Sequence, residues 1–212
     1  MPKAWMQERK RDYYYRKAKE DNYRSRAAYK LFQAIEKYRF IKKGDVVVDL
    51  GAAPGGWTQI ARKIVGNKGF VLGIDLKHIQ PFPEKNVRTI VGDITEQETL
   101  QQILETLPRK ADAVISDLSP NISGIWELDH ARQIDLAQQA LKIALEMLKP
   151  HGNFFVKVFQ GDLLNDFIDM VKRNFEIVRI IKPKASRAKS SEIFILGMHL
   201  KESATRNKAK FC

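Results

Sequence analysis

From Asp45 onward, the chain alternates short β-branched or aromatic runs with longer stretches of helical periodicity. This alternation is typical of a mostly parallel sheet with helices on both faces, because parallel neighbours need a crossover segment between them. Seven runs fit strands, within residues 45–50, 69–75, 86–93, 111–117, 152–159, 175–182 and 191–200. Helices are expected at 25–38, 57–65, 97–107, 129–148 and 163–174. The pattern predicts an α/β, Rossmann-like fold.

The length of 212 residues suits one domain with a sizeable core. We expect a basic aromatic N-terminal arm at 1–20, the domain at 21–200 and a basic tail at 201–212, both ends being mobile. No apolar run approaches the roughly 20 residues of a membrane span, and the start has no secretory signal, so we expect a cytoplasmic protein. The single cysteine, Cys212, excludes an internal disulfide, and the histidine spacing does not indicate a metal site.

The net charge of +12 favours a polyanionic partner, since lysine and arginine contacts to phosphates release counterions. A merely well-solvated surface is the alternative. The basic residues of the N-terminal segment are interleaved with aromatic ones, including Trp5, Tyr13, Tyr14 and Tyr15. That composition suits contact with RNA phosphates and stacking on unpaired bases, although a flexible solubilising arm would have it too.

Four consecutive predicted strands finish in a carboxylate, at Asp49, Asp75, Asp93 and Asp117. In open α/β sheets, ligands bind outside the carboxyl ends of the strands, near the point where strand order reverses. A single aspartate in such a place is often a turn former or a helix cap. Four in succession indicate that these acids rim one pocket.

The loop that begins at Asp49 reads DLGAAPGGW and opens a helix, so small residues let the backbone approach a ligand closely. A tight structural turn would use the same residues. The spacing differs from G-x-G-x-x-G, and Asp49 would repel a pyrophosphate, which disfavours an NAD-dependent oxidoreductase. A cationic cofactor such as S-adenosylmethionine suits these acids, with Asp75 accepting from its ribose hydroxyls and Asp93 from its adenine amino group.

Several longer strings make the chain resemble the FtsJ/RrmJ (RlmE) family of ribosomal RNA ribose 2′-O-methyltransferases. They are SRAAYKL (25–31), DLGAAPGGW (49–57), GIDL (73–76), GDIT (92–95), SDLSPNISG (116–124), FFVKVFQG (154–161) and KPKASRAKSSEIF (182–194). The resemblance spans roughly residues 24–200. It implies the class I adenosylmethionine-dependent methyltransferase fold with a seven-stranded, mostly parallel sheet. It also implies a catalytic tetrad of Lys30, Asp117, Lys157 and Glu192, and cofactor contacts by Gly55, Trp57, Asp75, Asp93 and Asp117.

Lys157 is a candidate catalytic residue independently of the resemblance, because it interrupts the apolar run FFVKVF. A lysine in a strand of this kind is costly unless its ammonium group reaches partners or water. It either takes the proton of a ribose hydroxyl or only orients that hydroxyl, and a lysine that reaches solvent from an edge strand is the structural alternative. Lys30 and Glu192 could equally be surface charges, since their spacing alone cannot bring them together.

The resemblance favours a uridine in the peptidyl-transferase region of large-subunit ribosomal RNA as the target, free or in the assembled subunit. We also expect the protein to be a monomer. A transfer RNA 2′-O-methyltransferase acting on the anticodon loop is the closest alternative, since the same tetrad serves such relatives. A non-catalytic ribosome-assembly factor that keeps the fold is a further one, and the complete tetrad argues against it.

Overall fold

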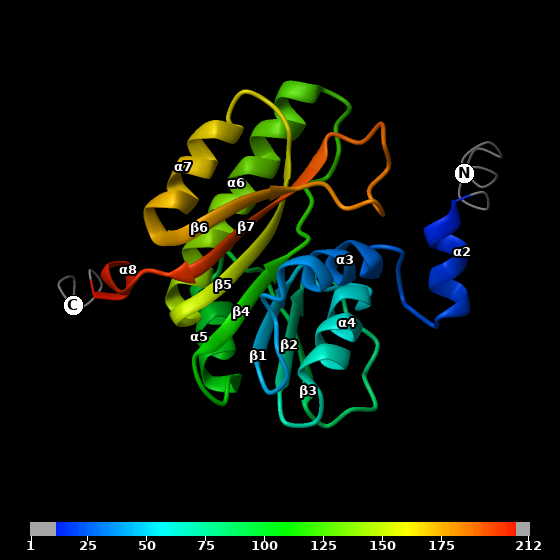
Figure 1. Cartoon of the computed structure of the whole chain (residues 1–212), viewed down its shortest axis with the longest axis vertical. Helices are drawn as coiled ribbons and strands as arrows, with labels where there is room; N and C mark the ends of the chain where they lie inside the picture. Colours follow the sequence, from blue (N-terminus) through cyan, green and yellow to red (C-terminus); the bar gives the residue numbers. More distant parts are fainter. Residues whose placement is uncertain (1–11, 207–212) are drawn as a thin grey trace.

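The computed structural model describes residues 12–206 and centres on a seven-stranded sheet of order β3-β2-β1-β4-β5-β7-β6 (Figure 1). The strands are β1 (Val46–Leu50), β2 (Phe70–Asp75), β3 (Val87–Val91), β4 (Ala111–Ser116), β5 (Leu148–Phe159), β6 (Phe175–Ile181) and β7 (Glu192–Leu200). The first five are parallel to one another, and β7 lies antiparallel between β5 and β6. The predicted seven-stranded, mostly parallel sheet is confirmed.

Helices cover both faces of this sheet, as expected. The helices of residues 12–206 are α2 (Tyr13–Glu20), α3 (Ala28–Tyr38), α4 (Gly56–Val65), α5 (Gln97–Thr106), α6 (Trp126–Met147), α7 (Leu164–Asn174) and α8 (Glu202–Arg206). Helices α3 and α4 bury their apolar sides against one face, whereas α5, α6 and α7 pack against the other. Burial of apolar side chains on both faces stabilises the sheet by about 1.5–3 kcal/mol for each fully buried large side chain.

The reversal of strand order falls between β1 and β4, which are hydrogen-bonded neighbours. The chain runs outward from β1 through β2 to β3 and then crosses back to β4 on the other side of β1. The loops that follow β1 and β4 therefore diverge at the carboxyl edge of the sheet. This divergence opens the crevice in which a ligand is expected.

Within the expected arm, the described residues 12–20 are more ordered than the sequence indicates. Residues 13–20 form helix α2, whose Ala18 is buried against Tyr29 and Ala185. The carboxylate of Asp12 caps this helix by accepting from the backbone N–H of Tyr15 at 3.1 Å. The packing of Ala18 against Tyr29 therefore holds the helix in place. The basic composition of the segment gave no indication of this contact.

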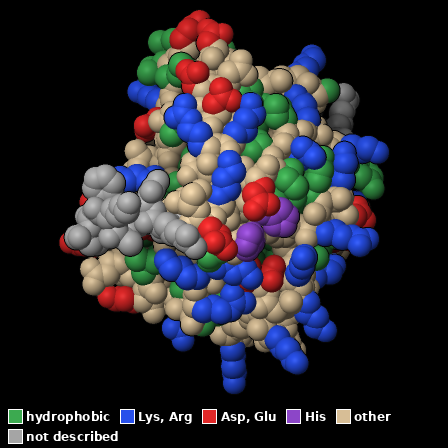
Figure 2. All heavy atoms as spheres, turned by 60° about the vertical axis from the view of Figure 1, so that its left-hand side comes forward, with side chains coloured by type: hydrophobic (Ala, Val, Ile, Leu, Met, Phe, Trp, Pro, Cys, Tyr) green, Lys and Arg blue, Asp and Glu red, His purple; other side chains and the backbone are tan. Residues whose placement is uncertain are grey.

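The expectations for Trp5, for the rest of residues 1–11 and for Cys212 lie outside the described residues. None of the helices within residues 12–206 is long and apolar enough to cross a membrane. Lysine and arginine side chains are spread over the face shown in Figure 2, with acidic side chains between them. This distribution agrees with the net charge of +12.

Candidate active site

A cleft of about 360 Å³ lies at the carboxyl edge of the sheet, at the predicted crevice. Its walls come from the loops after β1, β2, β3 and β4, and it is lined by Gly51, Ala53, Ile74, Asp75, Leu76, Lys77, Gly92, Asp93, Ile94, Thr95, Asp117, Leu118, Ser119, Asn121 and Leu136. Three carboxylates and one ammonium group belong to this lining. The cleft therefore favours a cationic ligand with both polar and apolar parts.

Asp75 ties two walls of the cleft together. One of its carboxylate oxygens accepts from the backbone N–H of Ala53 at 2.9 Å, and the other accepts from that of Lys77 at 2.8 Å. The first contact fixes the glycine-rich loop after β1 against the end of β2. Each carboxylate oxygen can accept more than one hydrogen bond, so Asp75 can still accept from the hydroxyl groups of a ligand.

Asp93 and Asp117 complete the acidic lining from opposite sides. The backbone N–H and the hydroxyl of Thr95 donate to Oδ1 of Asp93 at 2.9 and 2.8 Å, which leaves Oδ2 for a ligand. Asp117 follows β4, and its backbone N–H donates to the Leu50 carbonyl at 3.1 Å. The Asp93 carboxylate is thus held by Thr95, and the main chain of Asp117 is fixed to the end of β1.

Asp49 does not rim the cleft, contrary to the sequence expectation. It lies inside β1 with no exposed surface, where its carboxylate accepts from the Thr58 hydroxyl at 2.7 Å. Burial is the main cause that raises the pKa of Asp49 to about 7. The Thr58 hydrogen bond opposes this rise, and the nearby charges of Asp117 and Asp75 add to it. Asp49 is one residue short of the end of β1. Because side chains alternate along a strand, its carboxylate faces α4 and not the cleft.

The raised pKa of Asp49 predicts a pH-dependent stability. The unfolded chain releases this proton near pH 4 and the folded protein near pH 7, so the free energy of unfolding should fall as pH rises between those values. The Asp49→Asn variant should lack this decline and become the more stable protein above pH 7. Urea unfolding of both proteins at pH 5, 6, 7 and 8 measures the effect. Parallel curves for the two proteins would contradict it.

Gly55 and Trp57, which the resemblance assigns to the cofactor, lie behind the cleft wall. The indole N–H of Trp57 donates to the Ala27 carbonyl at 2.8 Å, and its ring stacks on Phe155 with the centroids 5.5 Å apart. Gly55 has φ +112°, and a Cβ atom there would come within 2.8 Å of the Phe82 ring. These two residues can therefore reach a ligand only through their backbone, at the N-terminus of α4.

Arg24 holds this region together, and it was not singled out from the sequence. Its guanidinium group donates to the carbonyls of Pro54, Gln80 and Pro81 at 2.6–3.3 Å. It also lies 3.8 Å from the centroid of the Phe82 ring, a cation–π contact. One side chain thus joins the loop after β1 to the loop after β2, and the basic composition around Arg24 gave no sign of this role.

Lys157 and Asp117 form an ion pair at the ends of adjacent parallel strands. The Lys157 ammonium donates to the Asp117 carbonyl at 2.9 Å and lies 3.0 Å from the carboxylate. Its side chain is only 7% exposed, so the reading as a solvent-reaching lysine is wrong. Gln133 of α6 braces both strand ends by donating to the carbonyls of Leu118 and Lys157. A buried, paired ammonium therefore lies beside the acidic cleft.

Lys30 and Glu192 form the second ion pair, although 162 residues separate them. The Lys30 ammonium donates to Glu192 at 2.7 Å, and the Ser186 hydroxyl donates to the other carboxylate oxygen at 2.9 Å. The pair lines a small pocket of about 220 Å³ together with Arg26, Arg187 and Ser190. This pocket is rich in positive charge and suits a phosphate group of a substrate.

The ladder between β5 and β7 brings the two pairs together. Glu192 is opposite Phe159, and Phe194 is opposite Lys157, so Lys157 and Glu192 are diagonal neighbours on one face. Diagonal neighbours in an antiparallel pair lie about 7–8 Å apart, within reach of long side chains. The Lys30 ammonium also lies 5.9 Å from the centroid of the Phe194 ring. The four predicted residues therefore gather at one edge of the sheet.

No group of three or more histidine, cysteine, aspartate and glutamate side chains within residues 12–206 is arranged to hold a metal ion. The charged groups of the site are three carboxylates that line the cleft and the ammonium groups of Lys30 and Lys157 beside it. Such a set can bind an organic cation and place an alcohol next to it. It also offers a lysine to take or orient the proton of that alcohol.

Comparison with known proteins agrees with this arrangement. Ribosomal RNA large subunit methyltransferase E of Methanocaldococcus jannaschii is 55% identical over 197 residues, which cover 92% of this chain and 80% of the relative. The crystal structure of a ribosomal RNA methyltransferase from Plasmodium falciparum superposes with a TM-score of 0.73 at 29% identity, covering 84% of this chain and 98% of the other. A methyltransferase from Streptococcus mutans in complex with SAH shares the fold at a TM-score of 0.50 and 16% identity, covering 82% of this chain and 96% of the other.

The sheet order, with β7 antiparallel beside β5, and the acidic cleft at the β1/β4 switch point define a class I S-adenosylmethionine-dependent methyltransferase. Within that class, the model of the FtsJ-like methyltransferase family matches residues 23–200. The chain belongs to this family.

Proposed function

We propose that this chain methylates a ribose 2′-hydroxyl of large-subunit ribosomal RNA, with a uridine as the target. The observation that carries the proposal is the buried Lys157–Asp117 pair at the edge of a cleft suited to adenosylmethionine. The names of the relatives, which are large-subunit ribosomal RNA methyltransferases, support the choice of substrate.

The residues of the cleft fit adenosylmethionine, which supplies an electrophilic methyl group on a positively charged sulfur when it is bound. In the proposed assignment, Asp75 accepts hydrogen bonds from the hydroxyls of its ribose and Asp93 accepts from its adenine amino group. Backbone N–H groups of Gly55 and Trp57 lie at the start of α4, where partial positive charge suits the carboxylate of the ligand. Asp117 adds negative charge near the sulfonium and holds Lys157.

The tetrad prepares the ribose hydroxyl. Lys157 Nζ would hold the 2′ oxygen beside the cleft, and as a base it would take the hydroxyl proton when the methyl group passes from the sulfur of the cofactor to that oxygen. In the milder version, Lys157 stays charged and only orients the hydroxyl. Glu192 keeps Lys30 at the site, and Lys30 steadies the reacting ribose or its phosphate.

All of these groups belong to one chain, so we propose that the monomer is active. We also propose that it acts in the cytoplasm. The domain that carries the activity is assigned to residues 21–200, between an N-terminal segment and a basic tail. The N-terminal segment is attached to this part of the site, because Asp12, the cap of helix α2, pairs with both Arg26 and Arg187 beside the Lys30–Glu192 pair.

The test is transfer of a labelled methyl group by the purified chain, followed by mapping of the modified ribose. Deproteinised large-subunit ribosomal RNA, assembled large subunits and transfer RNA serve as separate substrates. We expect 2′-O-methylation of ribosomal RNA, alone or in the subunit. Methylation of transfer RNA only would replace the proposal with the anticodon-loop alternative, and binding without transfer on every substrate would indicate an assembly factor.

The Lys30–Glu192 pair gives a second prediction. Glu192→Gln should lower kcat about tenfold to a hundredfold without changing the affinity for adenosylmethionine, because Lys30 loses its charged partner. Lys30→Gln should have a similar effect, and the double variant should be little worse than either single one, since the two side chains act as a unit. Single-turnover rates measure this coupling. Losses that multiply in the double variant would show that the two residues act independently.

A further inference from the structure

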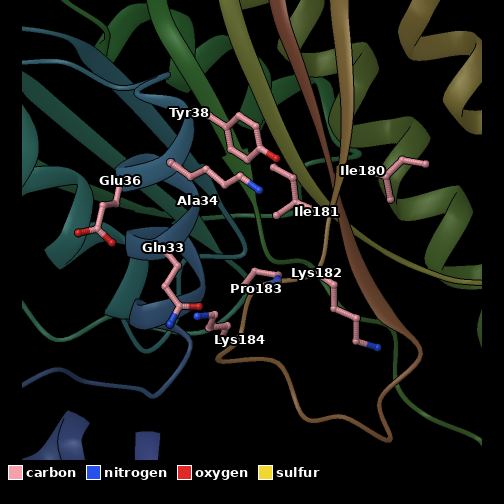
Figure 3. Close-up of a pocket in the computed structure, with 10 residues that line it drawn as sticks. Gln33, Ala34, Glu36, Tyr38, Ile180, Ile181, Lys182, Pro183 and Lys184 are labelled. Atoms are coloured by element: carbon pink, nitrogen blue, oxygen red, sulfur yellow. The ribbon is translucent and has the colours of Figure 1, made fainter.

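A groove of about 490 Å³ lies between α3 and the end of β6, apart from the cofactor cleft (Figure 3). It is lined by Gln33, Ala34, Glu36, Lys37, Tyr38, Ile180, Ile181, Lys182, Pro183 and Lys184. Three lysines and one acid belong to this lining, and the carboxylate of Glu36 points away from β6. Nothing in the proposed transfer chemistry uses this groove.

The groove is a continuation of the active site along α3. Lys30, Ala34 and Lys37 follow one another at helical spacing, so they share one stripe of the helix. Lys37 is two turns from Lys30, which places it about 10 Å further along the axis. The far wall belongs to the loop that leads into Glu192, and the Ala185 N–H of this loop donates to the Gln33 side chain at 3.0 Å. The same loop therefore borders both the groove and the catalytic pair.

Lysine side chains lie at the border of the groove, and aromatic and aliphatic side chains form its floor. Lys37 and Lys184 are exposed, and the Lys37 ammonium lies 5.2 Å from the centroid of the half-buried Tyr38 ring. Tyr38 points toward Ile181 across the groove (Figure 3). Lys182 has a structural contact, because its ammonium donates to the Ser190 carbonyl at 2.6 Å. Two exposed ammonium groups thus border a floor of aromatic and aliphatic side chains.

We propose that this groove binds the single-stranded RNA segment that flanks the methylated ribose. Lys37 and Lys184 contact its phosphates, and an unpaired base lies against Tyr38 and Ile181. Lysines beside an aromatic ring are the composition with which proteins hold unpaired RNA, and continuity with the catalytic pair sets the strand next to its target. The inference rests on the proposed function, which makes RNA the substrate.

The double variant Lys37→Glu/Lys184→Glu tests the groove, with Lys37→Gln/Lys184→Gln as a milder companion. Neither Lys37 nor Lys184 belongs to the catalytic or cofactor machinery. The matched control is Lys142→Glu, an exposed position of α6 on the opposite face of the sheet. Affinity for deproteinised large-subunit ribosomal RNA is measured across a range of salt concentrations, together with KM, kcat and the affinity for adenosylmethionine.

In the Glu variant, we expect the KM for RNA to rise about tenfold or more. The slope of log affinity against log salt concentration should fall by about 1.4, which is about 0.7 for each phosphate contact on a single strand. The kcat at saturating RNA and the affinity for adenosylmethionine should stay unchanged. The Gln variant should show the same loss of slope with a smaller change in KM, and Lys142→Glu should resemble the unmodified protein.

Three outcomes would overturn the groove assignment. The first is an unchanged slope and KM in both double variants. The second is an equal loss in Lys142→Glu, which would indicate a general effect of net charge. The third is a loss with assembled subunits but not with deproteinised RNA, which would make the occupant a protein. Failure of the proposed function looks different, because the unmodified chain would then bind RNA without transferring a methyl group.

Discussion

Lys157→Ala is expected to lower kcat for methyl transfer about 10³-fold or more, because the variant removes the group that holds the ribose hydroxyl and can take its proton. Adenosylmethionine should still bind, since Lys157 is not part of the cleft lining. Single-turnover transfer of a labelled methyl group and calorimetric binding of the cofactor measure the two properties separately. Retained turnover in the folded variant would count against the whole tetrad.

A conservative replacement separates the two roles that remain open for Lys157. Arginine keeps the positive charge but does not lose its proton in proteins. If Lys157 only orients the hydroxyl, Lys157→Arg should recover part of the activity that Lys157→Ala loses. If Lys157 takes the proton, both variants should be equally inactive. Lys142→Ala, at an exposed position of α6, controls for the loss of a lysine as such.

The sequence was informative where chemistry follows directly from position along a strand. Asp75 is the last residue of β2 and Asp117 follows β4, so the edge of a parallel sheet necessarily brings them to the same crevice. Lys157 was recognisable because an ammonium group in an apolar strand needs a partner, and Asp117 on the neighbouring strand provides it. These predictions needed only strand order and burial.

Other features depended on tertiary packing that no local pattern encodes. The contact between Lys30 and Glu192 joins positions 162 residues apart, and only the family resemblance paired them before the structure did. Asp49 follows the same sequence pattern as Asp75, Asp93 and Asp117, but it is the penultimate residue of β1. Side-chain alternation along the strand therefore turns it toward Thr58 of α4. The assigned roles of Gly55 and Trp57 in cofactor binding stay predictions, because the Trp57 ring packs in the core.

Asp75→Ala is expected to weaken adenosylmethionine binding about a hundredfold. Two hydrogen bonds from ribose hydroxyls to a charged acceptor are worth about 1.5–3 kcal/mol each, and each 1.4 kcal/mol corresponds to a factor of ten in affinity. Part of that loss is offset, because water can take the place of the missing carboxylate. The variant also releases the backbone N–H groups of Ala53 and Lys77, so the loop after β1 loses its tether to β2.

Isothermal titration calorimetry with adenosylmethionine measures the change, and Asp169→Ala is the matched control. Asp169 forms an exposed ion pair with Lys172 on α7, far along the chain from the cleft lining, and such pairs contribute little. At saturating adenosylmethionine, kcat for Asp75→Ala should return to within a few-fold of the unmodified value, because Asp75 binds the cofactor and does not touch the reacting hydroxyl. A Kd within twofold of the unmodified protein would remove Asp75 from the cofactor site, and a kcat that stays low at saturation would instead assign it to the transfer step.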